Sequence, residues 1–293
     1  LSFMCDKASF AVASIKDDTH SFIAYYDDTM LEAAIKYKTI VDEFDDAIKA
    51  GEFKMYLQPQ ISAKTRRLTG AEALVRRIKP DGTIISPIDF IPVYEKSGLI
   101  SRLDRYIWEQ AAAKLGEWKK AGINMSISVN ISPKDFYYID IFNTFAGLIK
   151  KYDIEPSNLK IEITETTIMS DVPNLMGELE ELRKAGFTLE MDDFGSGYSS
   201  LNTLKDINVD VLKVDMGFIK ETKNVKKSRI ILASVIKMAK ELNLLIITEG
   251  VETEEQVDNL TKLGCDVFQG YYFSKAIDVN EFEKRYLYRK KAG

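Results

Sequence analysis

Two adjacent carboxylates, Asp192 and Asp193, end a short apolar run and stand just before a glycine-rich turn. The apolar residues before them alternate as they do in a β-strand, and Gly195-Ser196-Gly197 follows after Phe194. Glycine allows a backbone to bend closely around a ligand. The pattern therefore predicts two anions at a strand end, beside a segment that is either a simple turn or a mobile loop.

Other polar residues also close or interrupt apolar runs, and most are 20 to 36 residues apart, the length of one strand plus one helix. They are Glu72, Asn130, Glu162, Asp192, Lys213, Glu249 and Gln269. In an α/β barrel the carboxyl ends of all strands meet on one face. We therefore expect these residues to converge in one pocket.

Four carboxylates that face one another predict a cation site, because like charges a few ångströms apart cannot all stay ionised alone. Oxygen ligands suit Mg²⁺ or Mn²⁺, whereas one histidine, His20, and two cysteines are too few for a typical hydrolytic zinc site. Taken singly, such residues are more often caps, turns or ion-pair partners. For Lys213 that alternative is a structural ion pair with Asp192 or Asp215.

The elements that would position these residues alternate between strand and helix from Gly51 onward. The predicted strands are 53–58, 68–76, 125–131, 159–164, 188–193, 211–214, 245–248 and 267–269. The predicted helices include 103–119, 139–151, 173–184, 228–242 and 254–263. This rhythm predicts an α/β fold with a closed barrel. A doubly wound open sheet is the main alternative, although no dinucleotide-binding glycine fingerprint follows any strand.

The first fifty residues have a different pattern. Residues 1 to about 28 predict a short helix and an edge strand around Phe22 to Tyr26, too little to close a core. Residues 29–50 have helical apolar spacing and end at Gly51, a plausible C-cap. We interpret this helix as a linker from an upstream domain.

Composition restricts the function further. The chain has 293 residues, 45% of them hydrophobic, and a net charge of −5 with both signs interspersed, which argues against a DNA-binding surface. Two distant cysteines favour a reducing, cytoplasmic setting, and no apolar run reaches the roughly 18 residues of a membrane span. The start at Leu1 indicates a fragment of a longer protein, and it leaves a membrane anchor upstream open.

Glu72-Ala73-Leu74, with Arg76 two residues later, resembles the motif that names the EAL domains, which are phosphodiesterases of the bacterial messenger cyclic di-GMP. The resemblance continues in order over about residues 45 to 280. Its other segments are Tyr56-Leu57-Gln58-Pro59, Ser86-Pro87, Phe90-Ile91-Pro92, Glu95, Ser97-Gly98-Leu99-Ile100, Ser128-Val129-Asn130, Glu162-Ile163-Thr164-Glu165, Asp192 to Ser200, Leu212-Lys213-Val214-Asp215, Glu249-Gly250-Val251-Glu252 and Gln269-Gly270-Tyr271.

This resemblance implies a modified (β/α)₈ TIM-type barrel with one antiparallel strand, and a two-metal site for Mg²⁺ or Mn²⁺. The first metal would have four ligands: Glu72, Asn130, Glu162 and Asp192. Asp192 would bridge to a second metal that Asp193 also holds. Glu249 would lie at that metal or its water, as the base in some schemes.

The remaining site residues also follow from the resemblance. Lys213 would contact the attacking water and share the catalytic role with Glu72 and Glu249. Three residues match substrate contacts: Gln58, Arg76 and Gln269. Three others match residues that support the site or the loop after Asp193: Glu165, Asp215 and Glu252. The product would be linear pGpG.

The departures from the family pattern are mild. Ser196 stands where the family often has a threonine, and Arg77 stands where it often has a tryptophan. Ser274 and Ala276 replace a common glycine and proline. We expect these changes to affect loop motion, contacts with guanine and the catalytic rate. Residues 1–28 resemble the end of an upstream GGDEF-like domain. Residues 29–50 would then form the linker helix, and residues 51–293 would form the EAL domain. A homodimer is expected by analogy. The alternatives are a receptor that binds cyclic di-GMP without hydrolysing it, and an unrelated metal-dependent barrel enzyme.

Overall fold

The computed structural model describes residues 2–14, 23–170, 172, 174–195, 204–205, 207–217 and 225–288. Contacts divide the chain into two units, Leu1–Phe53 with Arg77–Leu99 and Lys54–Arg76 with Ile100–Gly293. Within the described ranges, no helix has both the length and the apolar character needed to cross a membrane.

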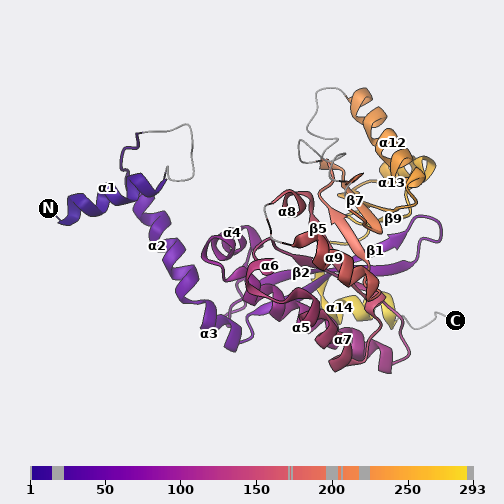
Figure 1. Cartoon of the computed structure of the whole chain (residues 1–293), viewed down its shortest axis with the longest axis horizontal. Helices are drawn as coiled ribbons and strands as arrows, with labels where there is room; N and C mark the ends of the chain where they lie inside the picture. Colours follow the sequence, from indigo (N-terminus) through magenta and orange to yellow (C-terminus); the bar gives the residue numbers. More distant parts are fainter. Residues whose placement is uncertain are drawn as a thin grey trace. The chain divides into compact units, whose positions relative to one another are not determined.

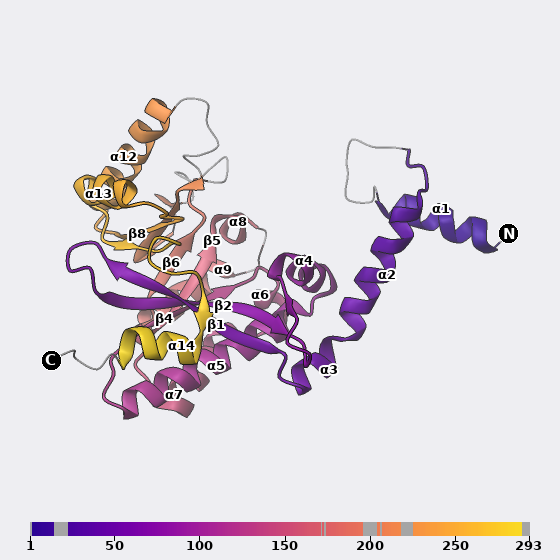
Figure 2. The ribbon, with the colours of Figure 1, turned by 180° about the vertical axis from the view of Figure 1, so that it is seen from behind.

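The larger unit is built on a ring of strands. Its strands are β1 (Phe53–Ser62), β2 (Leu68–Ile78), β4 (Ile127–Ile131), β5 (Leu159–Thr164), β6 (Leu189–Asp192), β7 (Val211–Asp215), β8 (Leu245–Glu249) and β9 (Val267–Phe268). Neighbours follow the order β1-β9-β8-β7-β6-β5-β4-β2, and pairing of β1 with β2 closes the ring (Figures 1 and 2).

The strand directions confirm the predicted barrel type. From β2 through β4 to β9 all observed pairings are parallel, whereas β1 runs antiparallel to β9. A short strand, β10 (Ile277–Asp278), also pairs with β1. The fold is therefore a closed α/β barrel with one antiparallel strand, and the open doubly wound sheet is excluded.

Register brings the polar residues of neighbouring strands to the same level. Asn130 of β4 lies opposite Glu162 of β5, and Asp215 of β7 lies opposite Glu249 of β8. Because successive side chains of a strand point to opposite faces, the apolar neighbours Ile161 and Ile163 point the other way from Glu162. Both isoleucines are buried.

Amphipathic helices follow the barrel strands and cover them. They include α5 (Ile100–Lys120), α6 (Asp135–Tyr138), α7 (Ile141–Tyr152), α8 (Glu165–Met169), α9 (Leu175–Lys184), α12 (Val225–Glu241), α13 (Glu254–Leu263) and α14 (Val279–Phe282). In α5, residues Leu103, Ile107 and Trp108 form part of one buried face. Helix α13 begins with a capping box between Thr253 and Gln256, which satisfies its first free N–H groups.

The smaller unit contains α1 (Ser2–Ser14), α2 (Asp28–Asp42), α3 (Phe44–Lys49), β3 (Ile84–Ile85) and α4 (Pro87–Ser97). An aromatic cluster forms its core, with the ring centroids of Phe44 and Tyr94 at 4.9 Å and those of Phe53 and Phe90 at 5.7 Å. Arg77 donates to Glu43 at 2.7 Å and to Glu52 at 2.8 Å. This unit thus has its own aromatic and ionic contacts.

The N-terminal expectations were partly wrong. Ile23–Asp27 form no strand, and the apolar side chains of Ile23 and Tyr25 are 73% and 85% exposed. The helix predicted over 29–50 is two helices, α2 and α3, separated at Glu43. Phe22, and Ser196 to Ser200 of the predicted loop, lie outside the described residues.

Candidate active site

Four carboxylates surround one lysine inside the barrel. The Nζ atom of Lys213 lies 2.8 Å from Glu162 Oε2 and 2.8 Å from Glu249 Oε1. It also lies 3.2 Å from Asp192 Oδ2 and 3.6 Å from Glu72 Oε2. The four acids come from β2, β5, β6 and β8, so the ring of strands brings together residues up to 177 positions apart, Glu72 to Glu249.

The strand β7 forces Lys213 into the barrel. Its neighbours Leu212 and Val214 are buried on the other face, and the Lys213 side chain has no exposed surface. Burial opposes the charge of Lys213, but the surrounding carboxylates outweigh burial and hold its pKa well above the usual value. The lysine therefore stays protonated and serves as a fixed positive charge.

A single ammonium does not neutralise this group. Burial is the main cause that raises the pKa of Glu162 well above its usual value, and the charge of Glu72 adds to the rise. Burial likewise raises the pKa of Glu249 to about 8, against the opposing effect of Lys213. With only Lys213 present, both acids resist ionisation at neutral pH, so the site favours a further cation.

The donor set fits such a cation. Oε1 of Glu162 is buried and has no hydrogen-bond partner among the described residues, and an amide, Asn130, lies at the same level and donates to Glu72 Oε1 at 3.3 Å. These are the oxygen donors that Mg²⁺ and Mn²⁺ prefer. In the described part of the chain no three acid, imidazole or thiol groups form a ready-made metal site.

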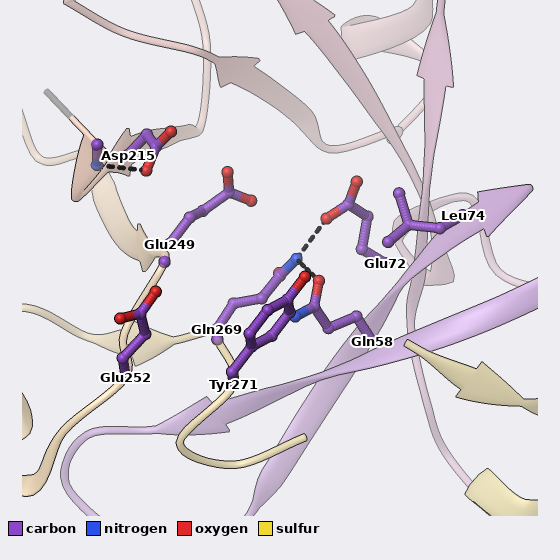
Figure 3. A pocket seen from close by; sticks show the side chains of 11 residues that line it. Gln58, Glu72, Leu74, Asp215, Glu249, Glu252, Gln269 and Tyr271 are labelled. Atoms are coloured by element: carbon purple, nitrogen blue, oxygen red, sulfur yellow. Dashed lines mark hydrogen bonds between the residues drawn. The ribbon is translucent and has the colours of Figure 1, made fainter. Parts of the chain in front are cut away.

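A cavity of about 380 Å³ opens above this group. It is lined by Gln58, Glu72, Leu74, Asp215, Gly217, Glu249, Gly250, Glu252, Gln269, Gly270 and Tyr271. Figure 3 shows the Gln269 amide between Glu72 and Gln58, with the Tyr271 ring beside them. The cavity thus contains the amides of Gln58 and Gln269, which can bind a polar ligand. Two of the acids that surround Lys213, Glu72 and Glu249, line the same cavity.

Comparison with known proteins identifies the family. The family model described as "EAL domain" matches residues 41–276.

The chain belongs to the EAL domain family.

Several relatives and one solved structure support this assignment. The chain is 34% identical over 278 residues to "Signaling protein YkoW" of Bacillus subtilis, covering 95% of this chain and 35% of that protein. It is 30% identical to "Bifunctional diguanylate cyclase/cyclic di-GMP phosphodiesterase MucR" of Pseudomonas aeruginosa, covering 94% of this chain and 40% of MucR. The structure described as "PaMucR Phosphodiesterase, c-di-GMP complex" has a TM-score of 0.78 at 32% identity, covering 83% of this chain and 99% of that one. This EAL domain therefore spans less than half the length of these two relatives.

The segment after β6 in this EAL domain bends at Asp193, which has a positive φ of 55°. Its N–H donates to Asp192 Oδ1 at 2.8 Å, and burial, with the charge of Asp192, raises the pKa of Asp193. Two residues later the N–H of Gly195 donates to Glu165 Oε2 at 3.3 Å. Glu165 is thus in contact with the start of the segment that the sequence predicts as a loop, whereas Gly197 lies outside the described residues.

Three of the predicted residues lie away from the lysine. Arg76 is not among the described residues that line the cavity; it donates to the carbonyl of Val75 at 2.8 Å and lies over the Tyr56 ring. Asp215 lines the cavity and accepts from the N–H of Gly217 at 2.7 Å. Glu252 lines the same cavity. In the described part of the EAL domain Lys213 pairs with Asp192 and not with Asp215, the other candidate partner.

Two residues of the site were not predicted. Trp108 of α5 donates from Nε1 to the carbonyl of Asn130 at 2.9 Å and so supports that strand end. Gln60, which is 1% exposed, donates to Gln269 inside the barrel. A signal for Gln60 exists in the sequence, since it lies two positions after Gln58 and therefore on the same face of β1.

Proposed function

We propose that this EAL domain hydrolyses cyclic di-GMP to linear pGpG. The observation that carries the proposal is the lysine with four carboxylates at strand ends, directly below a cavity lined by Gln58 and Gln269. Family membership and the named activity of MucR support the same reaction. The structural match to a MucR complex with c-di-GMP supports the ligand.

We propose that Glu72, Asn130, Glu162 and Asp192 hold one divalent cation, and that Asp193 and Glu249 join Asp192 at a second. When bound, Mg²⁺ or Mn²⁺ would strengthen a water nucleophile and relieve negative charge on the phosphate. The protein groups divide the rest of the work. Lys213 donates a hydrogen bond to the attacking water and stabilises the negative charge that develops on it. It can do so because the surrounding acids keep it protonated.

The reaction joins the oxygen of one water to phosphorus and breaks the bond from phosphorus to a ribose 3′ oxygen. In this scheme Glu249, ionised once the cations are bound, accepts a proton of the water, and a proton from solvent reaches the departing 3′ oxygen. Gln58 and Gln269 orient the nucleotide by hydrogen bonds, and Arg76 turns from the Val75 carbonyl to supply charge-assisted hydrogen bonds to phosphate. We propose that Glu165 holds the segment after Asp193, and that Asp215 and Glu252 support the acidic wall of the cavity.

The direct test is incubation of the purified chain with cyclic di-GMP and Mg²⁺, followed by chromatographic separation of substrate and pGpG. Formation of pGpG would support the proposal that the domain hydrolyses cyclic di-GMP. Cyclic di-GMP that stays intact but binds tightly would instead identify a receptor. No reaction and no binding would contradict the proposed function.

Three further proposals concern the assembly of the domain, the rest of its chain and its place in the cell. We propose that the chain forms a homodimer, that an upstream GGDEF-like region precedes it in the whole protein, and that it works in the cytoplasm. Light scattering of the purified chain would test the dimer.

A further inference from the structure

Gln60 is a buried glutamine that no catalytic role above uses. It lies in β1, and its side chain is inside the barrel with 1% of the residue exposed. Its Nε2 donates to Oε1 of Gln269 at 3.2 Å, and Gln269 is itself only 3% exposed. A buried polar side chain without a partner is strongly unfavourable, so the two amides depend on each other.

The direction of this hydrogen bond decides how Gln269 faces the acids. A carboxamide accepts at its oxygen and donates at its nitrogen. Because Gln60 donates to the Gln269 oxygen, the Gln269 nitrogen points the other way. It donates to Gln58 Oε1 at 3.2 Å and to Glu72 Oε2. The reverse orientation would place the Gln269 oxygen against the Glu72 carboxylate, which is repulsive.

Both carboxylate oxygens of Glu72 accept a hydrogen bond from an amide. Oε2 of Glu72 is held by Gln269, while Oε1 faces Asn130, whose Nδ2 lies 3.3 Å away. Partners of this kind fix the plane of a metal-binding carboxylate. Gln60 therefore acts on Glu72 through one intermediate side chain.

The neighbouring strand provides the space that Gln60 needs. A methyl group on Gly70 of β2 would lie 3.0 Å from Gln60 Oε1 and 2.7 Å from Ser126 Oγ. Glycine at position 70 thus allows the amide of Gln60 to lie against the backbone of β2.

We infer that Gln60 is a positioning residue that sets the orientation of the Gln269 amide, and through it the readiness of Glu72 to bind a divalent cation. The inference deepens the proposed function and rests on it for the identity of the cation site. The orientation of Gln269 itself can be measured without metal or nucleotide. Failure of the inference and failure of the proposed function are therefore distinguishable.

The experiment uses glutamine side-chain signals in NMR spectra of the full chain labelled with ¹⁵N-glutamine, because the sequence contains only five glutamines. Two of them report on folding away from the site: Gln110, which accepts from the N–H of Met55 at 3.2 Å, and Gln256, which caps α13. The test variants are Gln60→Met, which removes the amide at similar volume, and Gln60→Leu, which removes the amide with a shorter, branched side chain. Thr248→Val, a buried change in the same barrel outside the amide chain, is the control.

We expect both Gln60 variants to shift the Gln269 side-chain signals while those of Gln110 and Gln256 stay in place. A Mg²⁺ titration without nucleotide should show affinity about tenfold or more below the wild-type value, and Thr248→Val should match the wild type. Unmoved Gln269 signals, or equal Mg²⁺ affinity in wild type and variants, would overturn the inference. If Gln60→Met does not fold, Gln60→Leu decides. Absence of pGpG with wild-type protein would contradict the proposed function only.

Discussion

The Nζ atom of Lys213 lies 2.8 Å from Oε2 of Glu162, and neither side chain is exposed to solvent. Opposite charges at this distance inside a barrel stabilise each other strongly, but each has lost its hydration. The pair is therefore favourable only while both partners are present. Because three more carboxylates lie within 4 Å of the same ammonium, Lys213 is the group on which the charge balance depends.

Lys213→Met should lower the free energy of unfolding by about 3 to 5 kcal/mol, because it leaves buried carboxylates without their cation. Urea unfolding in the presence of EDTA measures this change without added metal. The double variant Lys213→Met with Glu162→Gln should recover part of the stability but none of the activity. A single variant as stable as the wild type would show that the lysine does not balance these acids.

A second ion pair in the barrel should behave in the same way without touching the chemistry. Lys160 Nζ lies 2.8 Å from Glu190 Oε1, with the two side chains 17% and 0% exposed. Lys160→Met should lower the free energy of unfolding by about 3 kcal/mol or more. Addition of Glu190→Gln should restore most of the lost stability.

The matched control for Lys160 is the exposed pair of Lys184 and Glu180 on α9, whose side chains are 72% and 42% exposed. Lys184→Met should change stability by less than about 1 kcal/mol, because solvent screens the pair. Equal effects of Lys160→Met and Lys184→Met in urea unfolding would contradict the role of burial.

Asp135 predicts a pH dependence of stability. Burial raises its pKa from 3.8 to about 6, although the nearby Ser101 side chain and the N–H of Ser132, which donates to Asp135 Oδ2 at 2.8 Å, oppose the rise. The folded state thus binds this proton more tightly than the unfolded state, so the contribution to stability is largest below about pH 4 and is lost as pH rises through 6.

Asp135→Asn removes this titration and keeps an oxygen for the Ser132 N–H. Relative to the wild type, the variant should gain about 2 to 3 kcal/mol in unfolding free energy between pH 4 and pH 7. Urea unfolding at several pH values measures the difference. A difference that stays constant over this range would rule out the raised pKa.

Gly270 allows two chain segments to approach closely beside Gln269. A methyl group at this position would lie 2.2 Å from the carbonyl oxygen of Val251. Gly270→Ala should therefore cost about 1 to 3 kcal/mol or more and weaken nucleotide binding by displacing Gln269. Gly147→Ala in α7, where no atom lies within 4 Å of the added methyl, should instead stabilise by about 0.5 to 1 kcal/mol. Thermal unfolding and nucleotide titration of the two variants would reveal whether Gly270 has this effect.

The strand ends were largely predictable because polar residues interrupt apolar runs at regular spacing. In a closed ring of parallel strands the carboxyl ends lie on one face, so these polar residues come together there. Helix α13, predicted over 254–263, has those bounds in the structure. The antiparallel direction of β1 came from the family resemblance, since side-chain alternation is the same in either strand direction.

Other features depend on register and could not be predicted from spacing. In the described residues Lys213 pairs with Asp192 of the neighbouring strand β6 and not with Asp215 of its own strand β7, and sequence spacing alone does not decide between these two partners. The link from Gln60 to Gln269 joins residues 209 positions apart across two antiparallel strands. Arg76 was expected at the substrate, but its position here is at the Val75 carbonyl, so its role in binding stays a prediction.

The most direct test of the account is cyclic di-GMP hydrolysis by wild-type protein and Glu72→Ala in the same Mg²⁺ buffer, with pGpG quantified by chromatography. Glu255→Ala, at an exposed acid of α13, is the matched control. We predict pGpG from the wild type and from Glu255→Ala, and none above background from Glu72→Ala, although that variant remains folded. Undiminished pGpG formation by Glu72→Ala would contradict the assignment of the carboxylate group around Lys213 as the hydrolytic site.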